Sequence, residues 1–304
     1  FISNRHGNGP SLTTPKSLKH AGSETVLILD STLEALVSIN LTTGNRHIIS
    51  TAGSDNIEEV GAGPRMKSPI GIELNPDFSK AWISMREQAS ILEVDLMTGD
   101  RSLINPNPIE DATTFKLPNG ISYDADNNQI LVSDIYLDRI QAIKLDNNIT
   151  TIAAGKHLTN NRNIKLSKPL DTVFDDINKR VYAVDSTLKA VVVWDTSNNT
   201  SKILSSLTIG SGVSILKPVA IDLNVAENTA YIADEKLNSI VSINLENGNR
   251  TVLSNQAVGS GPTFKKLSGI SFNKTTRSLL ASDTEEQGVF SINIDNGNRK
   301  LISK

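Results

Sequence analysis

Two residues in the middle of the chain carry the oxygen atoms that a hard metal ion prefers. Asn119 follows Pro118, and Asp171 lies in the corresponding segment further along the chain. An amide oxygen and a carboxylate are both typical ligands of Ca²⁺. The pair predicts a calcium site, with the alternative that Asn119 is a turn residue whose side chain bonds the backbone.

Four further side chains could bind or transform a ligand. Arg86 carries a guanidinium fork that fits a carboxylate or phosphate, the alternative being an ion pair on the surface. His157 and Arg162 belong to a long polar and basic loop over residues 154–168, and loops of this length in compact folds are often functional. His20 and His157 are candidate bases, although a single histidine is more often a packed or surface residue.

These six residues stand out because they depart from an internal repeat. A segment of proline or leucine, two further residues and an aliphatic or threonine residue recurs with starts at 69, 118, 169, 218 and 267. Counting back by one period from Pro69 places the first copy near residue 19. Self-similarity at a fixed period of this length indicates a solenoid, a propeller or an array.

Each copy predicts four short strands separated by tight turns. The second strand of five copies ends in an aspartate, and Met85 takes that place in the second copy. A turn of the type Asn-Gly-Asn-Arg follows the third strand in several copies, and Asn-Gly between apolar runs is a strong hairpin signal. Four strands per copy without helical periodicity are typical of a propeller blade.

The sequence therefore predicts an all-β fold, a six-bladed β-propeller with four antiparallel strands per blade, as one domain over residues 1–304. The expected copies cover residues 19–68, 69–117, 118–168, 169–217, 218–266 and 267–303, and residues 1–18 form a lead-in. Phe1–Ser3 resembles an outermost strand. It either latches the ring by pairing with the last blade or is the remnant of an upstream repeat.

The residues that repeat are expected to be scaffold rather than site. The aspartates are predicted to accept hydrogen bonds from the amides of their own turns, and they are Asp30, Asp134, Asp185, Asp234 and Asp283. The arginines of the turns are predicted to be solvated at the periphery, and they are Arg46, Arg101, Arg250 and Arg299.

The repeat resembles that of the NHL-repeat propellers, which share Gly-x-Gly-Pro before a copy, Pro-x-Gly-Ile at its start and the strand ending in Asp. A second, local resemblance covers residues 117–124 and 130–134, which look like the central segment of the gluconolactonase and regucalcin group. That resemblance implies a divalent metal on the axis, with Asn119 as a ligand and Asp171 close to the place of a second. The glutamate ligand of that group has no clear match here.

Composition excludes several classes of function. The net charge of −3 gives no general attraction to nucleic acid or to anionic membranes, and 4% aromatic residues argue against stacking of single-stranded nucleic acid. The chain has no cysteine, so disulfides and thiolate chemistry are excluded. No apolar run is long enough for membrane insertion. The start at Phe1 fits an exported protein, periplasmic or extracellular, whose leader has been removed.

Three functional hypotheses remain at this point. The first is an extracytoplasmic propeller that binds a small ligand or a protein at its top face, the face bearing the loops that lead into the innermost strands. The second is a calcium-dependent lactonase or esterase, in which the metal polarises a carbonyl and activates water. The third is a purely structural repeat. A propeller fold alone does not decide among them, because function resides in sites and not in folds.

Overall fold

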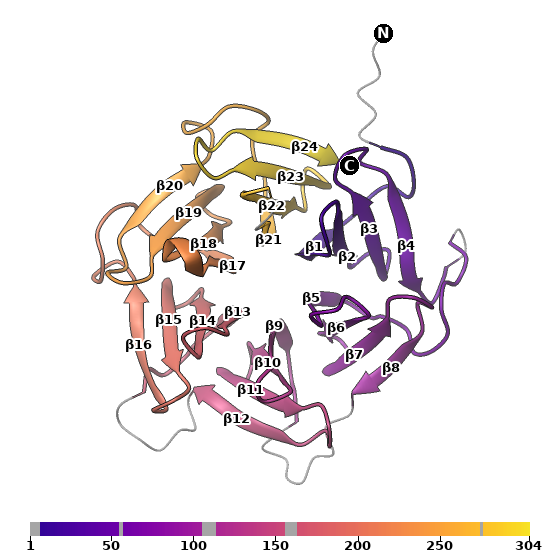
Figure 1. The fold of residues 1–304 in the computed structure, drawn as a ribbon, viewed down its shortest axis with the longest axis horizontal. Coiled ribbons are helices and arrows are strands. Elements are labelled where there is room, and N and C mark those ends of the chain that lie inside the picture. Colours follow the sequence, from indigo (N-terminus) through magenta and orange to yellow (C-terminus); the bar gives the residue numbers. More distant parts are fainter. Residues whose placement is uncertain (1–6, 55–56, 105–113, 156–162, 274–275) are drawn as a thin grey trace.

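The computed structural model describes residues 7–54, 57–104, 114–155, 163–273 and 276–304. It is a ring of six four-stranded antiparallel sheets around a central axis (Figure 1). The six-bladed propeller expected from the repeat is therefore confirmed. One short 3-10 helix, η2 (Val225–Glu227), lies in a turn of the fifth blade, and no helix among the described residues is long and apolar enough to span a membrane.

Every blade consists of four strands that are consecutive in the chain. The first blade has β1 (Pro15–His20), β2 (Thr25–Asp30), β3 (Ala35–Asn40) and β4 (Arg46–Thr51). The second has β5 (Pro69–Leu74), β6 (Lys80–Met85), β7 (Ser90–Asp95) and β8 (Arg101–Ile104). The third has β9 (Pro118–Asp124), β10 (Gln129–Asp134), β11 (Arg139–Lys144) and β12 (Thr150–Gly155).

The remaining blades follow the same order. The fourth has β13 (Pro169–Asp175), β14 (Arg180–Asp185), β15 (Ala190–Asp195) and β16 (Thr200–Ser205). The fifth has β17 (Pro218–Asn224), β18 (Thr229–Asp234), β19 (Ser239–Asn244) and β20 (Arg250–Ser254). The sixth has β21 (Leu267–Asn273), β22 (Ser278–Asp283), β23 (Gly288–Asn293) and β24 (Arg299–Ser303).

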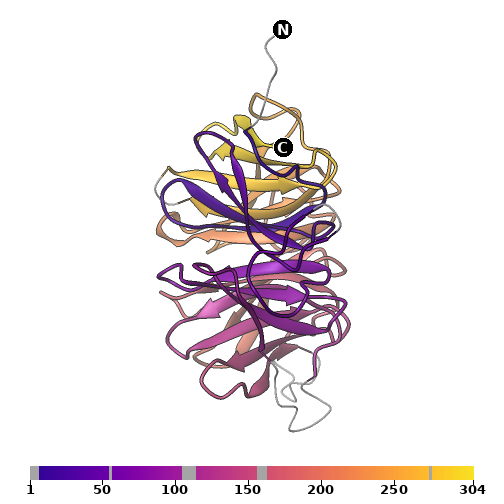
Figure 2. The same cartoon turned by 90° about the vertical axis from the view of Figure 1, so that its right-hand side faces the viewer.

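The innermost strands of the blades surround the axis, and the fourth strands form the rim (Figures 1 and 2). The first blade begins at Pro15, ahead of the expected start at residue 19. The reason is that the connection from β4 to β5 is longer than the later connections between blades. Residues 1–6, which include the expected latch strand, lie outside the described residues.

The hydrophobic core is divided among the junctions between blades. Six clusters of buried aliphatic and aromatic side chains are present, one at each junction. The cluster between the last and first blades joins Leu18, Ile28 and Val37 to Leu280 and Val289. Because both faces of each sheet are covered, the strands are rich in continuous apolar residues rather than strictly alternating.

The aspartates that end the second strands are scaffold, as expected. All five are fully buried. In each, one carboxylate oxygen accepts two N–H groups of the following turn, and the other accepts the N–H groups that lead into the innermost strand of the same blade. Met85 is fully buried at the corresponding place in the second blade. The carboxylates therefore fix the chain where it enters each sheet.

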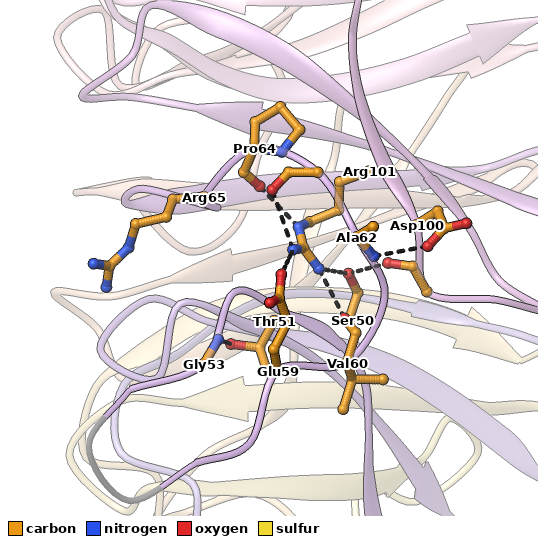
Figure 3. Close-up of polar contacts among 12 residues, drawn as sticks. Ser50, Thr51, Gly53, Glu59, Val60, Ala62, Pro64, Arg65, Asp100 and Arg101 are labelled. Carbon is orange, nitrogen blue, oxygen red and sulfur yellow. Dashed lines mark hydrogen bonds and ion pairs between the residues drawn. The ribbon is translucent and has the colours of Figure 1, made fainter.

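The prediction that the turn arginines are solvated is wrong. Arg46, Arg101, Arg250 and Arg299 are only 4–7% exposed. Figure 3 shows Arg101, whose Nη1 donates to Ser50 Oγ on the preceding blade at 3.0 Å and whose Nε donates to Pro64 O at 2.8 Å. We call this arrangement of arginine, serine and loop carbonyls the arginine clamp.

Burial of the clamp comes from a glycine loop that folds over the hairpin turn before each of these four arginines. A Cβ atom on Gly61 would stand 1.9 Å from Gly99 O, and a Cβ on Gly63 would stand 2.1 Å from Arg101 O. Only glycine allows this approach, and both residues have positive φ. The Gly-x-Gly-Pro pattern is therefore the partner of the arginine turn, and together they seal the outer edge of a blade junction.

Candidate functional site

A bulge at the start of every innermost strand aims one side chain at the axis. Pairing with the second strand is irregular just after the first residue of β1, β5, β9, β13, β17 and β21. Bulges commonly redirect side chains in this way. The six residues at this position all line one cavity at the mouth of the axial opening, and they are Lys16, Ile70, Asn119, Leu170, Val219 and Ser268.

We call this cavity the upper mouth, since it lies on the face where the innermost strands begin. Its volume is about 350 Å³. Besides the bulge residues, its walls come from the residues that precede innermost strands and from those that follow second strands. These include Leu117, Lys168, Lys217 and Lys266 from the first group and Arg86, Ile135, Glu235 and Thr284 from the second.

The upper mouth is strongly basic. Five of the six blades each contribute one cation to its lining, and these are Lys16, Arg86, Lys168, Lys217 and Lys266. Glu235 is the one acidic residue among the described residues of the lining, and its carboxylate pairs with Lys217 Nζ at 2.7 Å. A concave site lined by charges of one sign concentrates counter-ions of the opposite sign.

The cations of the upper mouth lie close enough to affect one another. The pKa of the Lys16 ammonium lies below its usual value, first because the group is buried and then because of the positive charges of Arg86 and Lys266. Burial likewise lowers the pKa of the Arg86 guanidinium. An anion bound among these groups would relieve their mutual repulsion and their loss of hydration.

Arg86 and Asn119 are joined across the junction between the second and third blades. Arg86 Nη2 donates a short hydrogen bond to Asn119 Oδ1, and Asn119 Nδ2 donates a short one to Leu170 O. Asn119 is 6% exposed. The amide therefore orients the guanidinium toward the mouth. Asn119 bonds the backbone, as in the alternative interpretation of the sequence, but from strand β9 and not from a turn. Its expected role as a metal ligand stays a prediction.

Asp171 lies further along the axis and does not line the upper mouth. Its Oδ1 accepts Thr172 N–H at 2.9 Å and its Oδ2 accepts Ile221 N–H at 3.0 Å. A Cβ atom on Gly120 would stand 2.4 Å from Asp171 Oδ1, so the glycine after Asn119 is required by the approach of this carboxyl group. Burial raises the pKa of Asp171 to about 7, against the opposing effects of the Ile221 amide and Lys19.

These surroundings do not fit a calcium ion well. The Asn119 oxygen faces the guanidinium of Arg86, a positive charge, and Asp171 does not line the cavity that Asn119 lines. Within the described ranges, no group of three or more His, Asp or Glu residues is placed to hold a metal. The calcium site remains a prediction from the sequence, and no chemistry is derived from it.

The other expected site residues are divided between locations. Arg86 and Asn119 lie together at the upper mouth. His20 lies at the opposite end of the axis, and His157 and Arg162 fall outside the described residues. Sequence reasoning missed Lys217 and Lys266, although a signal was present. Lysine immediately precedes the opening residue of three successive copies, at positions 168, 217 and 266.

Asp171 should make the stability of the fold depend on pH. With a folded pKa of about 7, the native state keeps a proton that the unfolded chain releases near pH 4, so stability falls as pH rises through this window. We expect this group to lower the free energy of unfolding by roughly 1–3 kcal/mol between pH 5 and pH 8. Urea unfolding at several pH values across this range should show that the free energy of unfolding changes less with pH in Asp171→Asn than in the wild type. An unchanged slope would assign the pH dependence to other groups.

No family model matches the sequence, and no curated protein matches it. A chain in the crystal structure of a nidogen/laminin complex is similar in fold, with 15% identity, a TM-score of 0.67 and coverage of 97% of this chain and 94% of that one. A streptogramin B lyase has 13% identity, a TM-score of 0.64 and coverage of 99% and 86%. An auxiliary nutrient binding protein from Bacteroides thetaiotaomicron has 12% identity, a TM-score of 0.66 and coverage of 96% and 69%. At these identities the similarity shows the propeller fold alone.

Proposed function

We propose that this protein is an extracytoplasmic binding propeller whose upper mouth takes a small anionic molecule bearing at least two carboxylate or phosphate groups. The observation that carries the proposal is the convergence of five cations from five blades on one cavity of about 350 Å³, whose described lining residues include a single carboxylate. Neighbours of this fold include a nutrient binding protein and a lyase. The binding role is favoured because the described residues that line the mouth show a charge pattern and include no set of groups for catalysis.

The arrangement suggests how such a ligand would be held. Lys168, Lys217 and Lys266 are exposed and belong to adjacent blades. The ammonium groups of Lys168 and Lys266 can move to meet one end of the ligand, while that of Lys217 is held by Glu235. Arg86 is held by Asn119 on the other side of the mouth and presents a planar fork to a second acidic group. Leu170, Val219 and Ile70 give the floor between them an apolar character, as in most small-molecule sites.

Titration calorimetry with citrate and with inorganic pyrophosphate, at ionic strength matched by NaCl, tests the proposal. We expect saturable binding that weakens at least about tenfold in the double variant Lys168→Gln/Lys266→Gln, because hydrogen bonds to charged groups contribute about 1.5–3 kcal/mol each. Lys300→Gln on the rim strand β24 is the matched control and should bind as the wild type does. Absence of binding by both anions, or equal loss in the control, would overturn the proposal.

A further inference from the structure

A second cavity lies at the opposite end of the axis, and we call it the lower mouth. Its volume is about 630 Å³. It is lined by the ends of the innermost strands and by the turns that lead into the second strands. The residues on which the argument rests are Glu73, Phe78, Ser122, Asp176, Asp222 and Phe272.

The charge of the lower mouth is opposite to that of the upper mouth. Glu73, Asp176 and Asp222 supply three carboxyl groups, and Lys19 supplies one ammonium, which pairs with Glu73 at 3.0 Å. Burial opposes the charge on Lys19, but Glu73 and Asp222 hold its pKa above the usual value. His20 lines the same cavity, and burial lowers its pKa, so it adds no cation at neutral pH. The balance favours a ligand with positive charge.

The lower mouth also gathers aromatic rings, in a chain with only 4% aromatic residues. Four line it, namely Phe78, Tyr123, Phe174 and Phe272. Two of these rings are supported from behind, since Tyr123 packs on Trp82 at 4.9 Å and Phe272 on Tyr231 at 5.8 Å between centroids. Aromatic faces next to carboxylates are the usual means of holding an organic cation.

One buried hydroxyl group and one exposed aromatic ring at this cavity can contact a ligand. Ser122 is 1% exposed and lines the cavity, yet its Oγ has no hydrogen-bond partner in the structure. A buried hydroxyl group is normally paired, so this atom is available to a ligand donor. Phe78 is 45% exposed. Its positive φ belongs to a repeated turn, since Asn128, Lys179, Asn228 and Arg277 also have positive φ in the turns between the first and second strands of other blades.

We propose that the lower mouth binds a small organic cation with primary ammonium groups, such as a diamine. The ammonium would donate to Ser122 Oγ and to the carboxylates of Asp176 and Asp222, and its methylene chain would lie against Phe78 and Phe272. Asp222 already accepts Leu223 N–H and Phe272 N–H, which holds its carboxylate in place at the strand end. The inference uses none of the residues of the upper mouth.

Calorimetric titration with 1,4-diaminobutane against the full chain tests this inference. We expect saturable binding that weakens at least about tenfold in Asp176→Asn/Phe78→Asn, since one charge and one aromatic face are lost. Both changes suit the fold, because Asp176 is exposed and asparagine tolerates positive φ better than phenylalanine does. Asp146→Asn, in an exposed turn of the third blade, is the matched control.

A second variant separates binding from stability. Ser122→Ala removes a hydroxyl group that has no partner, so the melting temperature should stay the same or rise while diamine affinity falls at least about threefold. The double variant Lys168→Gln/Lys266→Gln should bind the diamine as the wild type does, which distinguishes failure here from failure at the upper mouth. No saturable binding of the diamine, or binding unchanged in Asp176→Asn/Phe78→Asn, would overturn the inference.

Discussion

Replacing Asp234 with alanine should lower the free energy of unfolding by about 4 kcal/mol or more, because buried donors left without partners cost about 1–3 kcal/mol each. Asp234 is fully buried. Its Oδ1 accepts Lys236 N–H at 3.1 Å and Leu237 N–H at 3.0 Å, and its Oδ2 accepts Leu216 N–H at 2.7 Å and Lys217 N–H at 3.0 Å. The substitution leaves all four donors unpaired beside a cavity that alanine cannot fill.

Urea unfolding followed by circular dichroism and by fluorescence of Trp82 and Trp194 measures this loss. Asp146→Ala is the control, since Asp146 is exposed in a turn, and it should change stability by no more than about 0.5 kcal/mol. A loss of less than about 1 kcal/mol in Asp234→Ala would mean that water replaces the carboxylate. These aspartates would then not be main contributors to the stability of the blades.

The same carboxylates connect the scaffold to the proposed anion site. Asp185, Asp234 and Asp283 accept the backbone N–H groups of Lys168, Lys217 and Lys266, respectively. These three lysines of the upper mouth therefore extend from backbone that is fixed by buried hydrogen bonds, and their side chains are exposed, with Lys217 paired to Glu235. The same short segment thus holds a buried structural carboxylate and the backbone of a lysine that lines the mouth.

The fold could be predicted because its determinants are local and repeat. Asn247 and Gly248 mark a hairpin turn, the aspartate ends the second strand, and a small residue such as Gly120 stands where another blade approaches. Each of these signals is read within a few residues of the chain. Six repetitions of the same local signals leave few alternatives to a closed ring of similar sheets.

The site was harder to predict because its residues lie far apart in the sequence and come together only when the blades close into a ring. Lys16 and Arg86 come from neighbouring blades and affect each other's charge across the junction between them, and no local pattern in the chain shows that. The burial of Arg101 was not predicted for the same reason. A turn of the type Gly-Asp-Arg indicates an exposed hairpin, and its burial results from the loop containing Gly61 and Gly63, which the sequence shows only as a separate motif.

Replacing Arg46 with lysine should weaken the junction where the ring closes and lower the free energy of unfolding by about 3 kcal/mol, the cost expected when a buried charged network loses its partners. Arg46 Nε donates to Pro10 O at 2.6 Å and its Nη1 donates to Ser303 Oγ at 2.7 Å. Ser303 Oγ in turn donates to Gly44 O at 2.7 Å. A lysine ammonium is a compact group without the planar fork of arginine, so it cannot donate to Pro10 O and Ser303 Oγ in the same geometry.

Arg101→Lys is the matched control because Arg101 forms the same clamp between the first and second blades. Both variants should lose stability, but only Arg46→Lys should speed hydrogen exchange in β1 and β21. The chain itself tethers the first blade to the second. The described strands of the first and last blades meet through packed side chains and through hydrogen bonds that each involve at least one side chain. Faster exchange at β1 and β21 in both variants, or in neither, would show that ring closure does not depend on this arginine, and the cluster of Leu18, Val37 and Leu280 would then be the closure that holds.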